Sequence, residues 1–280
     1  MFLTKMYITN NPQIAKIAEN NGVDIIWIDL EILGKIERQK GRNTVISRHL
    51  ISDISPVKRC LSRAKLLVRV NPWNCNSGNE IEQVINAGAD IIMLPMWRKI
   101  GEVQKFIECV NGRVRTVLLL ETYEATQLVD EVLKLEGLDE IYIGLNDLHI
   151  SMHKTFMFEL LADGTVETLC NKIKNRGISY GFGGIAKIGD GLLPAEKIIA
   201  EHYRLGSTRV ILSRTFCDNA KIDSLEEIER VFNENMLKIN NYEKFLLNQN
   251  EDFFIENQND VKLIVENVVE MLKETKTKDE

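Results

Sequence analysis

The sequence predicts an α/β protein built on a (β/α)8 TIM barrel, with extra helices at its C-terminal end. Eight short, largely apolar segments alternate with segments of helical periodicity, and four of them begin 25 residues apart, at residues 65, 90, 115 and 140. This spacing is close to that of a minimal strand–helix unit, and continuous apolar runs are expected of parallel strands covered by helices. Eight units within about 215 residues favour a closed barrel.

The eight predicted strands are Phe2–Tyr7, Asp24–Glu31, Lys65–Asn71, Asp90–Met96, Arg115–Thr122, Glu140–Asp147, Ile178–Ile185 and Arg209–Phe216. The segments between them place apolar side chains on one helical face, for example Ile100, Val103, Phe106, Ile107 and Val110. An open, doubly wound sheet is the alternative architecture. It is disfavoured because no glycine fingerprint follows the first strand.

The barrel is expected to span residues 1–222, and residues 223–280 are expected to form a helical extension. Ser224 and Glu227 have capping-box spacing, an Asn-rich stretch over 240–259 separates two helical patterns, and the second pattern runs from Val261 to Leu272. Because a barrel needs one helix after its last strand, one helix is surplus. It is expected to pack on another subunit, under the barrel, or on the side of its own barrel.

The composition excludes several classes of protein. The formal net charge of -6 argues against a dedicated nucleic-acid binder, which needs clustered basic residues. The apolar runs are far shorter than the roughly 20 residues that span a bilayer, and no signal peptide is recognisable at the N-terminus. Five cysteines without a Cys-x-x-Cys pair are typical of free thiols. We therefore expect a cytoplasmic protein that contacts neither nucleic acid nor membrane.

Polar side chains end several predicted strands, where a barrel carries its chemistry. They are Asp29 and Glu31 on the second strand, Arg69 and Asn71 on the third, Glu121 on the fifth, and Asn146, Asp147 and His149 on the sixth. Carboxylates that close neighbouring strands repel each other unless a cation lies between them. Without a Cys/His cluster the expected ion is hard, Mg²⁺ or Mn²⁺, held by Glu121 and Asp147. The alternative role for either acid is a helix N-cap.

Five segments resemble, in order and spacing, the blocks of the HpcH/HpaI aldolase and citrate lyase β-subunit superfamily. They are IWIDLE, LVRVN, GADIIMLPM, LLLET and IGLNDLHIS, and the resemblance covers roughly residues 10–152. It implies a (β/α)8 barrel whose last helix is often exchanged between subunits of a homo-oligomer, and a bound divalent metal. Glu121 and Asp147 match the metal ligands, and Arg69 matches the arginine that contacts the keto or enolate oxygen. Gly144 and Asn146, in the same GLND segment as Asp147, are expected to contact substrate.

The general base does not follow the family pattern. The pyruvate aldolases carry a histidine three residues after the aspartate of the second block, where this chain has Ile32. The citrate lyase branch has an acid there, which is also missing. His49, His149 and Glu31 are the candidate bases. The charged loop over residues 34–42 is expected to be solvated, with binding of a phosphate or carboxylate as the alternative.

The segment over residues 181–207 is longer and richer in glycine than expected for the family. Gly183, Gly184, Gly189 and Gly191 would let backbone amides approach an anionic part of the substrate, with charge from Lys187 and Arg214. Ordinary turn glycines are the alternative explanation. For Arg69, likewise, a salt bridge to a barrel acid such as Glu31 is an alternative or additional role.

The sequence thus predicts a divalent-metal-dependent carbon–carbon lyase of the class II aldolase type, which acts on a 2-keto acid through a pyruvate-type enolate. Arg69 would place positive charge where negative charge develops. Two alternatives stay open. One is a lyase or synthase for citryl- or malyl-type substrates, including thioesters, and the other is a barrel that binds a ligand without turnover.

Overall fold

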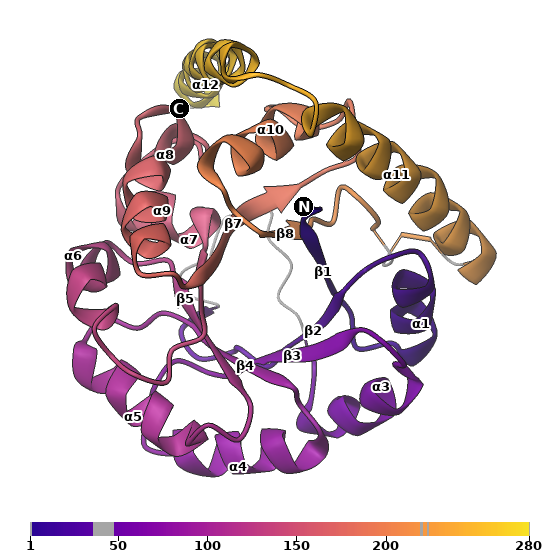
Figure 1. Ribbon diagram of the computed structural model, residues 1–280, viewed down its shortest axis with the longest axis vertical. Coiled ribbons are helices and arrows are strands. Elements are labelled where there is room, and N and C mark those ends of the chain that lie inside the picture. Colours follow the sequence, from indigo (N-terminus) through magenta and orange to yellow (C-terminus); the bar gives the residue numbers. More distant parts are fainter. Residues whose placement is uncertain (1, 36–47, 219–220, 223, 280) are drawn as a thin grey trace.

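The computed structural model describes residues 2–35, 48–218, 221–222 and 224–279. Eight parallel strands form a closed barrel in sequence order, and β8 pairs with β1 to close it (Figure 1). The strands are β1 (Thr4–Ile8), β2 (Ile25–Asp29), β3 (Lys65–Arg69), β4 (Ile91–Leu94), β5 (Arg115–Leu120), β6 (Glu140–Ile143), β7 (Ser179–Ile185) and β8 (Arg209–Leu212). The predicted TIM barrel is confirmed.

A ring of helices surrounds the barrel. In chain order the helices are α1 (Pro12–Asn20), the 3-10 turn η1 (Ile51–Asp53), α3 (Ile54–Cys60), α4 (Ser77–Ala87), α5 (Ile100–Val110), α6 (Tyr123–Val132), α7 (Leu145–Ser151), α8 (Glu159–Ala162), α9 (Thr165–Asn175), α10 (Ala195–Leu205), α11 (Leu225–Leu246) and α12 (Glu251–Asp279). One apolar core fills the space between strands and helices. A smaller one, which includes Ile25, Trp27, Leu67, Met93 and Leu119, fills the barrel itself.

The sixth strand is shorter than the sequence predicts. Its ladder ends at Ile143, and the following residues, from Leu145 onward, form α7. An apolar run does not distinguish the end of a strand from the start of a helix, which explains the error. As a result Asn146, Asp147 and His149 lie on a short helix above the barrel, and not on the strand itself.

A β-bulge interrupts the pairing of β7 with β8, because Gly181 pairs with Arg209 whereas Gly184 pairs with Ile211. The hydroxyl of Tyr142 fills the gap from inside the barrel. It donates to the carbonyl of Gly183 at 2.6 Å and accepts from the N–H of Ile211 at 3.0 Å. Gly183 has a φ of 56°, which favours glycine. The bulge thus shapes the backbone of β7 at the upper end of the barrel.

The two C-terminal helices are longer than predicted. Ser224 caps α11, its side chain accepting from the N–H of Glu227 as expected. The break predicted over the Asn-rich stretch is present but short, since helix continues through 240–246 and resumes at Glu251. Asn257 shows why asparagine does not end the helix here: it is buried, and its amide donates to the carbonyl of Lys197 and to Glu201.

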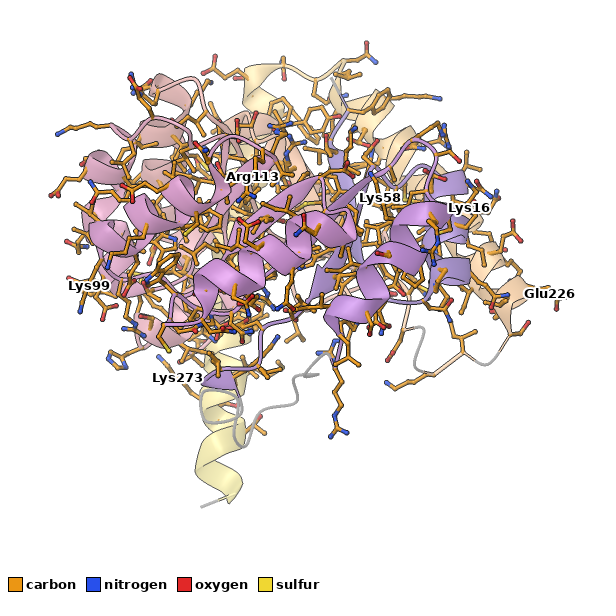
Figure 2. The ribbon with its side chains drawn as sticks, turned by 90° about the horizontal axis from the view of Figure 1, so that it is seen from below. Lys16, Lys58, Lys99, Arg113, Glu226 and Lys273 are labelled. Carbon is orange, nitrogen blue, oxygen red and sulfur yellow. The ribbon has the colours of Figure 1, made fainter. Side chains whose placement is uncertain are left out.

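The helix α11 packs against α1 and α10 and so takes the place of the barrel's eighth helix (Figure 1). The surplus helix is α12, which packs against α8 and α10 of its own chain. Its C-terminal part extends beyond the body of the barrel (Figure 2). Exchange of a helix between subunits stays a prediction. Among the described residues, no helix has the length and apolar character needed to cross a membrane.

Candidate active site

A cavity of about 1350 Å³ lies at the carboxyl ends of the strands, where a barrel enzyme carries its active site. Side chains from the ends of β2, β3, β5 and β6 form one part of its wall, and the segments after β7 and β8 form the other. The predicted site residues that line it include Arg69, Glu121, Gly144, Asn146, Asp147, Gly184 and Arg214.

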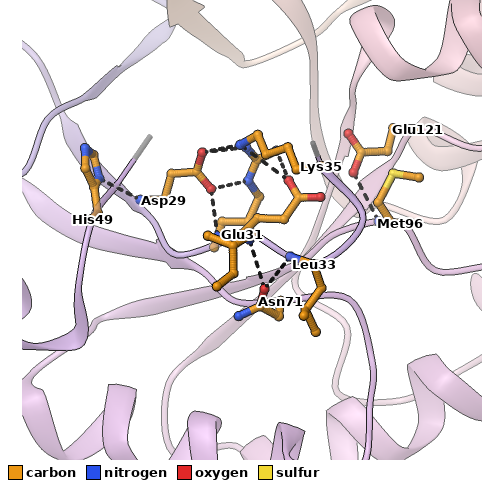
Figure 3. Close-up of polar contacts among 10 residues, drawn as sticks. Asp29, Glu31, Leu33, Lys35, His49, Asn71, Met96 and Glu121 are labelled. Carbon is orange, nitrogen blue, oxygen red and sulfur yellow. Dashed lines mark hydrogen bonds and ion pairs between the residues drawn. The ribbon is translucent and has the colours of Figure 1, made fainter. Parts of the chain in front are cut away.

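Four buried charged side chains gather at the ends of β2 and β3, and we call Asp29, Glu31, Lys35 and Arg69 the charge cluster (Figure 3). Arg69 Nε and Nη2 each donate to the carboxylate of Asp29 at 2.8 Å, in a bidentate pair. Lys35 Nζ donates to Asp29 Oδ2 at 2.7 Å, the same oxygen that accepts from Arg69 Nη2. Glu31 lies 3.3 Å from Arg69 Nη1 and 3.7 Å from Lys35 Nζ. The predicted salt bridge between Arg69 and Glu31 is therefore present.

The charge cluster is balanced, with two carboxylates and two basic groups. Burial alone would raise the pKa of Asp29, but the charge and hydrogen bonds of Arg69, followed by those of Lys35, hold that pKa well below its usual range. The guanidinium of Arg69 also lies over the ring of Trp27, 5.3 Å from its centroid. The cluster thus fixes the side chain of Arg69 at the cavity wall.

A second group of acids lies elsewhere on the cavity wall, and we call Glu121 and Asp147 the carboxylate pair. Glu121 directly follows β5, and Asp147 lies on α7. Glu121 is buried, and its Oε1 accepts from the N–H of Met96 at 3.1 Å. Burial raises the pKa of Glu121 well above its usual value, and the charge of Asp147 raises it further, while Arg69 opposes the shift. Both residues line the cavity.

Neither acid is a helix N-cap. Thr122 caps α6, and its hydroxyl accepts from the N–H of Ala125. Gly144 occupies the N-cap position of α7, and Asp147 lies within the first turn. The capping alternative raised by the sequence is thus wrong for both residues.

Gly144 makes the position of Glu121 possible. A Cβ atom at Gly144 would lie 3.0 Å from both Cβ and Oε2 of Glu121 and 3.1 Å from Cδ1 of Leu119. These distances are tighter than ordinary packing allows. The contact explains a glycine here independently of any contact with substrate.

The carboxylate pair fits a hard divalent cation. Mg²⁺ is commonly held by one or two carboxylates together with water and substrate oxygens. Both acids line the cavity, and the charge of Asp147 adds to the larger effect of burial in raising the pKa of Glu121. Across the described part of the chain, no group of three or more His, Cys, Asp or Glu side chains could by itself hold a metal ion.

The three candidate bases, Glu31, His49 and His149, differ in whether they line the cavity and in what they contact. Glu31 belongs to the charge cluster, next to Arg69 and Lys35. His49 lines the cavity, and its Nδ1 accepts from the backbone N–H of Asp29 at 3.0 Å (Figure 3).

His149 does not line the cavity. It is buried on α7, with Nδ1 3.2 Å from the carbonyl oxygen of Leu145, four residues earlier on the same helix. Residues two apart on a helix point in different directions, so proximity to Asp147 in sequence does not bring His149 into the cavity. A role for His149 as the base stays a prediction that this position does not favour.

The opposite wall of the cavity comes from the segments after β7 and β8. It carries Gly183, Gly184, Lys187, Gly191 and Arg214, as the glycine-rich sequence predicted. Gly189 is not among the lining residues. Its N–H instead donates to Glu196 Oε2 at 3.0 Å, next to the start of α10, so the turn explanation holds for it.

Two residues of the candidate site, Lys35 and Tyr142, were not predicted from the sequence. Lys35 falls in the loop expected to be solvated, yet it is buried in the charge cluster, so the expectation is wrong for this residue. Residues 36–42 of that loop lie outside the described residues. Tyr142 has a strand position that predicts an inward side chain, but its contact with the β7 bulge has no signal in the local sequence.

A comparison with family models gives a match to the HpcH/HpaI aldolase/citrate lyase family over residues 4–159, more than half of the chain. The matched region contains the charge cluster and the carboxylate pair. A search of curated protein sequences gave no match.

Solved structures of similar fold are distant in sequence. An HpcH/HpaI aldolase/citrate lyase family protein from Burkholderia cenocepacia J2315 superposes with a TM-score of 0.60 at 13% identity, covering 81% of this chain and 95% of its own. The citrate synthase SbnG gives 0.57 at 16%, covering 82% and 94%. Tryptophan synthase from M. tuberculosis gives 0.56 at 12%, covering 84% and 92%. At these identities the likeness shows the barrel fold alone.

Proposed function

Because this chain belongs to the HpcH/HpaI aldolase/citrate lyase family, we propose that it is a metal-dependent carbon–carbon lyase that acts on a 2-keto acid. The observation that carries this proposal is the carboxylate pair. Glu121 and Asp147 line one cavity, and the charge of Asp147 acts with burial to raise the pKa of Glu121. Mg²⁺ or Mn²⁺ is the cation that two carboxylates and substrate oxygens suit best.

When bound, the cation would act as a Lewis acid toward the carboxylate and keto oxygen of the substrate. The side chains of this protein supply the rest. Glu121 and Asp147 would hold the cation, and Glu121 is itself buried at the cavity wall. Asn146 lines the cavity beside Asp147 and is suited to contact the substrate from α7.

Arg69 would act at the keto oxygen. Cleavage of the bond β to the keto group leaves an electron pair that moves onto this oxygen, where negative charge develops. Three contacts of Arg69 go to Asp29 and Glu31, and a guanidinium has five N–H groups, so N–H groups on both Nη atoms are left for the substrate. A donor fixed before the reaction stabilises the transition state without reorganisation.

The wall after β7 and β8 would receive the far end of the substrate. Gly184 offers its backbone, and Arg214 and Lys187 offer positive charge at the same cavity. The cavity is also larger than a three-carbon keto acid needs, since pockets of about 300–1,000 Å³ already hold drug-sized ligands. Both observations favour a substrate with a second acidic group. A citryl- or malyl-type substrate has such a group and is the second candidate.

The test is proton–deuterium exchange at the methyl group of pyruvate, followed by NMR with and without Mn²⁺. We expect exchange that depends on the metal and falls by more than about 100-fold in Glu121→Gln and Asp147→Asn, because the loss of a Lewis acid costs several kcal/mol of transition-state stabilisation. Glu124→Gln is the control, an exposed acid of α6 paired with Arg98.

A second readout does not need turnover. Binding of Mn²⁺ removes the electron paramagnetic resonance signal of the free ion, so the titration measures affinity directly. The two variants of the carboxylate pair should lose binding, while Glu124→Gln should keep it. Equal affinity in all three variants and the unaltered protein would overturn the metal assignment.

A further inference from the structure

His49 is the cavity residue whose chemistry the proposed function leaves open. His49 directly precedes Leu50 and η1, and two hydrogen bonds fix this stretch of the chain. The N–H of Leu50 donates to Asp53 Oδ2 at 2.8 Å, and Asn10 Nδ2 donates to the same oxygen at 2.8 Å. These two bonds tie the chain beside His49 to η1 and to the segment after β1. The imidazole is thereby held at the edge of the barrel, against the end of β2.

The hydrogen bond to the backbone determines which ring nitrogen carries a proton. The N–H of Asp29 donates to His49 Nδ1 at 3.0 Å, so Nδ1 uses its lone pair as an acceptor. A neutral imidazole has one N–H and one acceptor nitrogen. The proton must therefore be on Nε2. Burial lowers the pKa of His49, opposed in part by the charges of Asp29 and Asp53 and assisted by Lys35, which favours this neutral form.

We propose that His49 is a neutral hydrogen-bond donor, which presents Nε2–H to an oxygen of the bound keto acid, and that it is not the general base. The inference rests on the proposed function for the identity of the substrate. Its support is geometric: an acceptor nitrogen already engaged by a backbone N–H, in a ring that lines the cavity. A base would need a free lone pair, which Nε2 does not have in this tautomer.

Asp29 holds both Arg69 and the proposed donor His49 in place. The carboxylate of Asp29 binds Arg69, and its backbone N–H binds His49, while Asp29 and Arg69 are direct partners in the pairing of β2 with β3. Arg69 and His49 are thus fixed relative to one another through one strand end. Two prepositioned donors at one wall would bind two oxygens of a planar keto acid, such as the keto oxygen and a carboxylate oxygen.

The first experiment reads the tautomer directly. The protein contains four histidines, so ¹⁵N labelling of histidine gives few ring signals, and the set missing in His49→Gln belongs to His49. We expect an unprotonated Nδ1 and a protonated Nε2 near neutral pH. A protonated Nδ1 would overturn the proposal. This measurement is independent of any activity, so it can fail or succeed whatever the outcome for the proposed lyase.

The second experiment uses two matched substitutions. Asparagine places an amide near the position of Nδ1 and can keep the bond from Asp29, whereas glutamine places its amide N–H near the position of Nε2. For a donor, His49→Gln should keep exchange of the pyruvate methyl group within about tenfold of the unaltered protein, while His49→Asn should lose about 100-fold, as for other lost donors to a developing oxyanion. The loss should appear in kcat more than in KM.

The remaining outcomes contradict the proposal. If His49 were the general base, both variants would be equally inactive, because neither amide accepts a proton. If His49 had a purely structural role, His49→Asn would be the more active of the two variants, because it keeps the contact with Asp29. Urea unfolding of both variants separates a loss of donor from a loss of fold.

Discussion

Two walls of one cavity carry carboxylates, and the two walls differ in the charges that surround these acids. On the β2–β3 side, Asp29 and Glu31 are matched by Arg69 and Lys35. On the β5–β6 side, Glu121 receives one backbone N–H and faces a second acid, Asp147. Ions of opposite charge lower the pKa of a buried acid, whereas burial and a like charge raise it. The first wall pairs its acids with basic side chains, whereas at the second the charge of Asp147 adds to burial in raising the pKa of Glu121.

The largest effect is expected at the balanced wall. Arg69→Met should lower the free energy of unfolding by about 3–5 kcal/mol, because it leaves two buried carboxylates with only Lys35. The matched control is Arg98→Met, in an exposed pair with Glu124, which should cost about 0–1 kcal/mol. Urea unfolding measures both. Equal costs for the two variants would mean that the charge cluster does not stabilise this wall.

A smaller effect is expected at the second wall from Gly144→Ala. The added methyl group meets Glu121 and Leu119 at 3.0–3.1 Å, and overpacking of this kind costs about 1–3 kcal/mol. It should also weaken Mn²⁺ binding, because Glu121 must move. Gly101→Ala on α5 is the control: no heavy atom lies within 4 Å of its new Cβ, and alanine should stabilise the helix by up to about 1 kcal/mol. Unchanged unfolding and metal affinity in Gly144→Ala would show that Glu121 does not depend on this glycine.

The sequence predicted the barrel because its signal is local. Each strand is an apolar run, and each helix has its own period, so neither depends on distant contacts. The ends of elements were less predictable: the run that includes Ile143 and Leu145 is apolar on both sides of the strand–helix boundary. The residues Arg69, Glu121 and Asp147 could be found because strand order brings the ends of strands to one face.

The rest of the site depends on contacts that local patterns do not encode. Lys35 is buried because the chain turns back after β2, six residues beyond the acid that it binds. His49 meets Asp29 across 20 residues, and Tyr142 reaches a bulge about 40 residues away. The role of Gly144 appears only when the side chain of Glu121 is in place. Each of these contacts requires the assembled barrel.

The two walls should also respond to pH with opposite signs. The pKa of folded Asp29 lies below its unfolded value of about 3.9, so its stabilising effect is complete above about pH 4 and is lost as the pH falls through the folded-state value. The pKa of folded Glu121 is raised, so its ionisation costs stability as the pH rises through the folded-state value.

Urea unfolding in the presence of EDTA tests this contrast. The stability lost in Asp29→Asn should be constant from pH 7 to about pH 4.5 and should shrink below that by up to about 1.4 kcal/mol per pH unit. Glu121→Gln should instead gain stability relative to the unaltered protein as the pH rises above about 4.5, because it removes a charge that burial and Asp147 disfavour. Slopes of the same sign in the two variants would contradict the division of the cavity into a wall of paired charges and a wall where two acids act on each other. Opposite slopes would support this division without any assay of turnover.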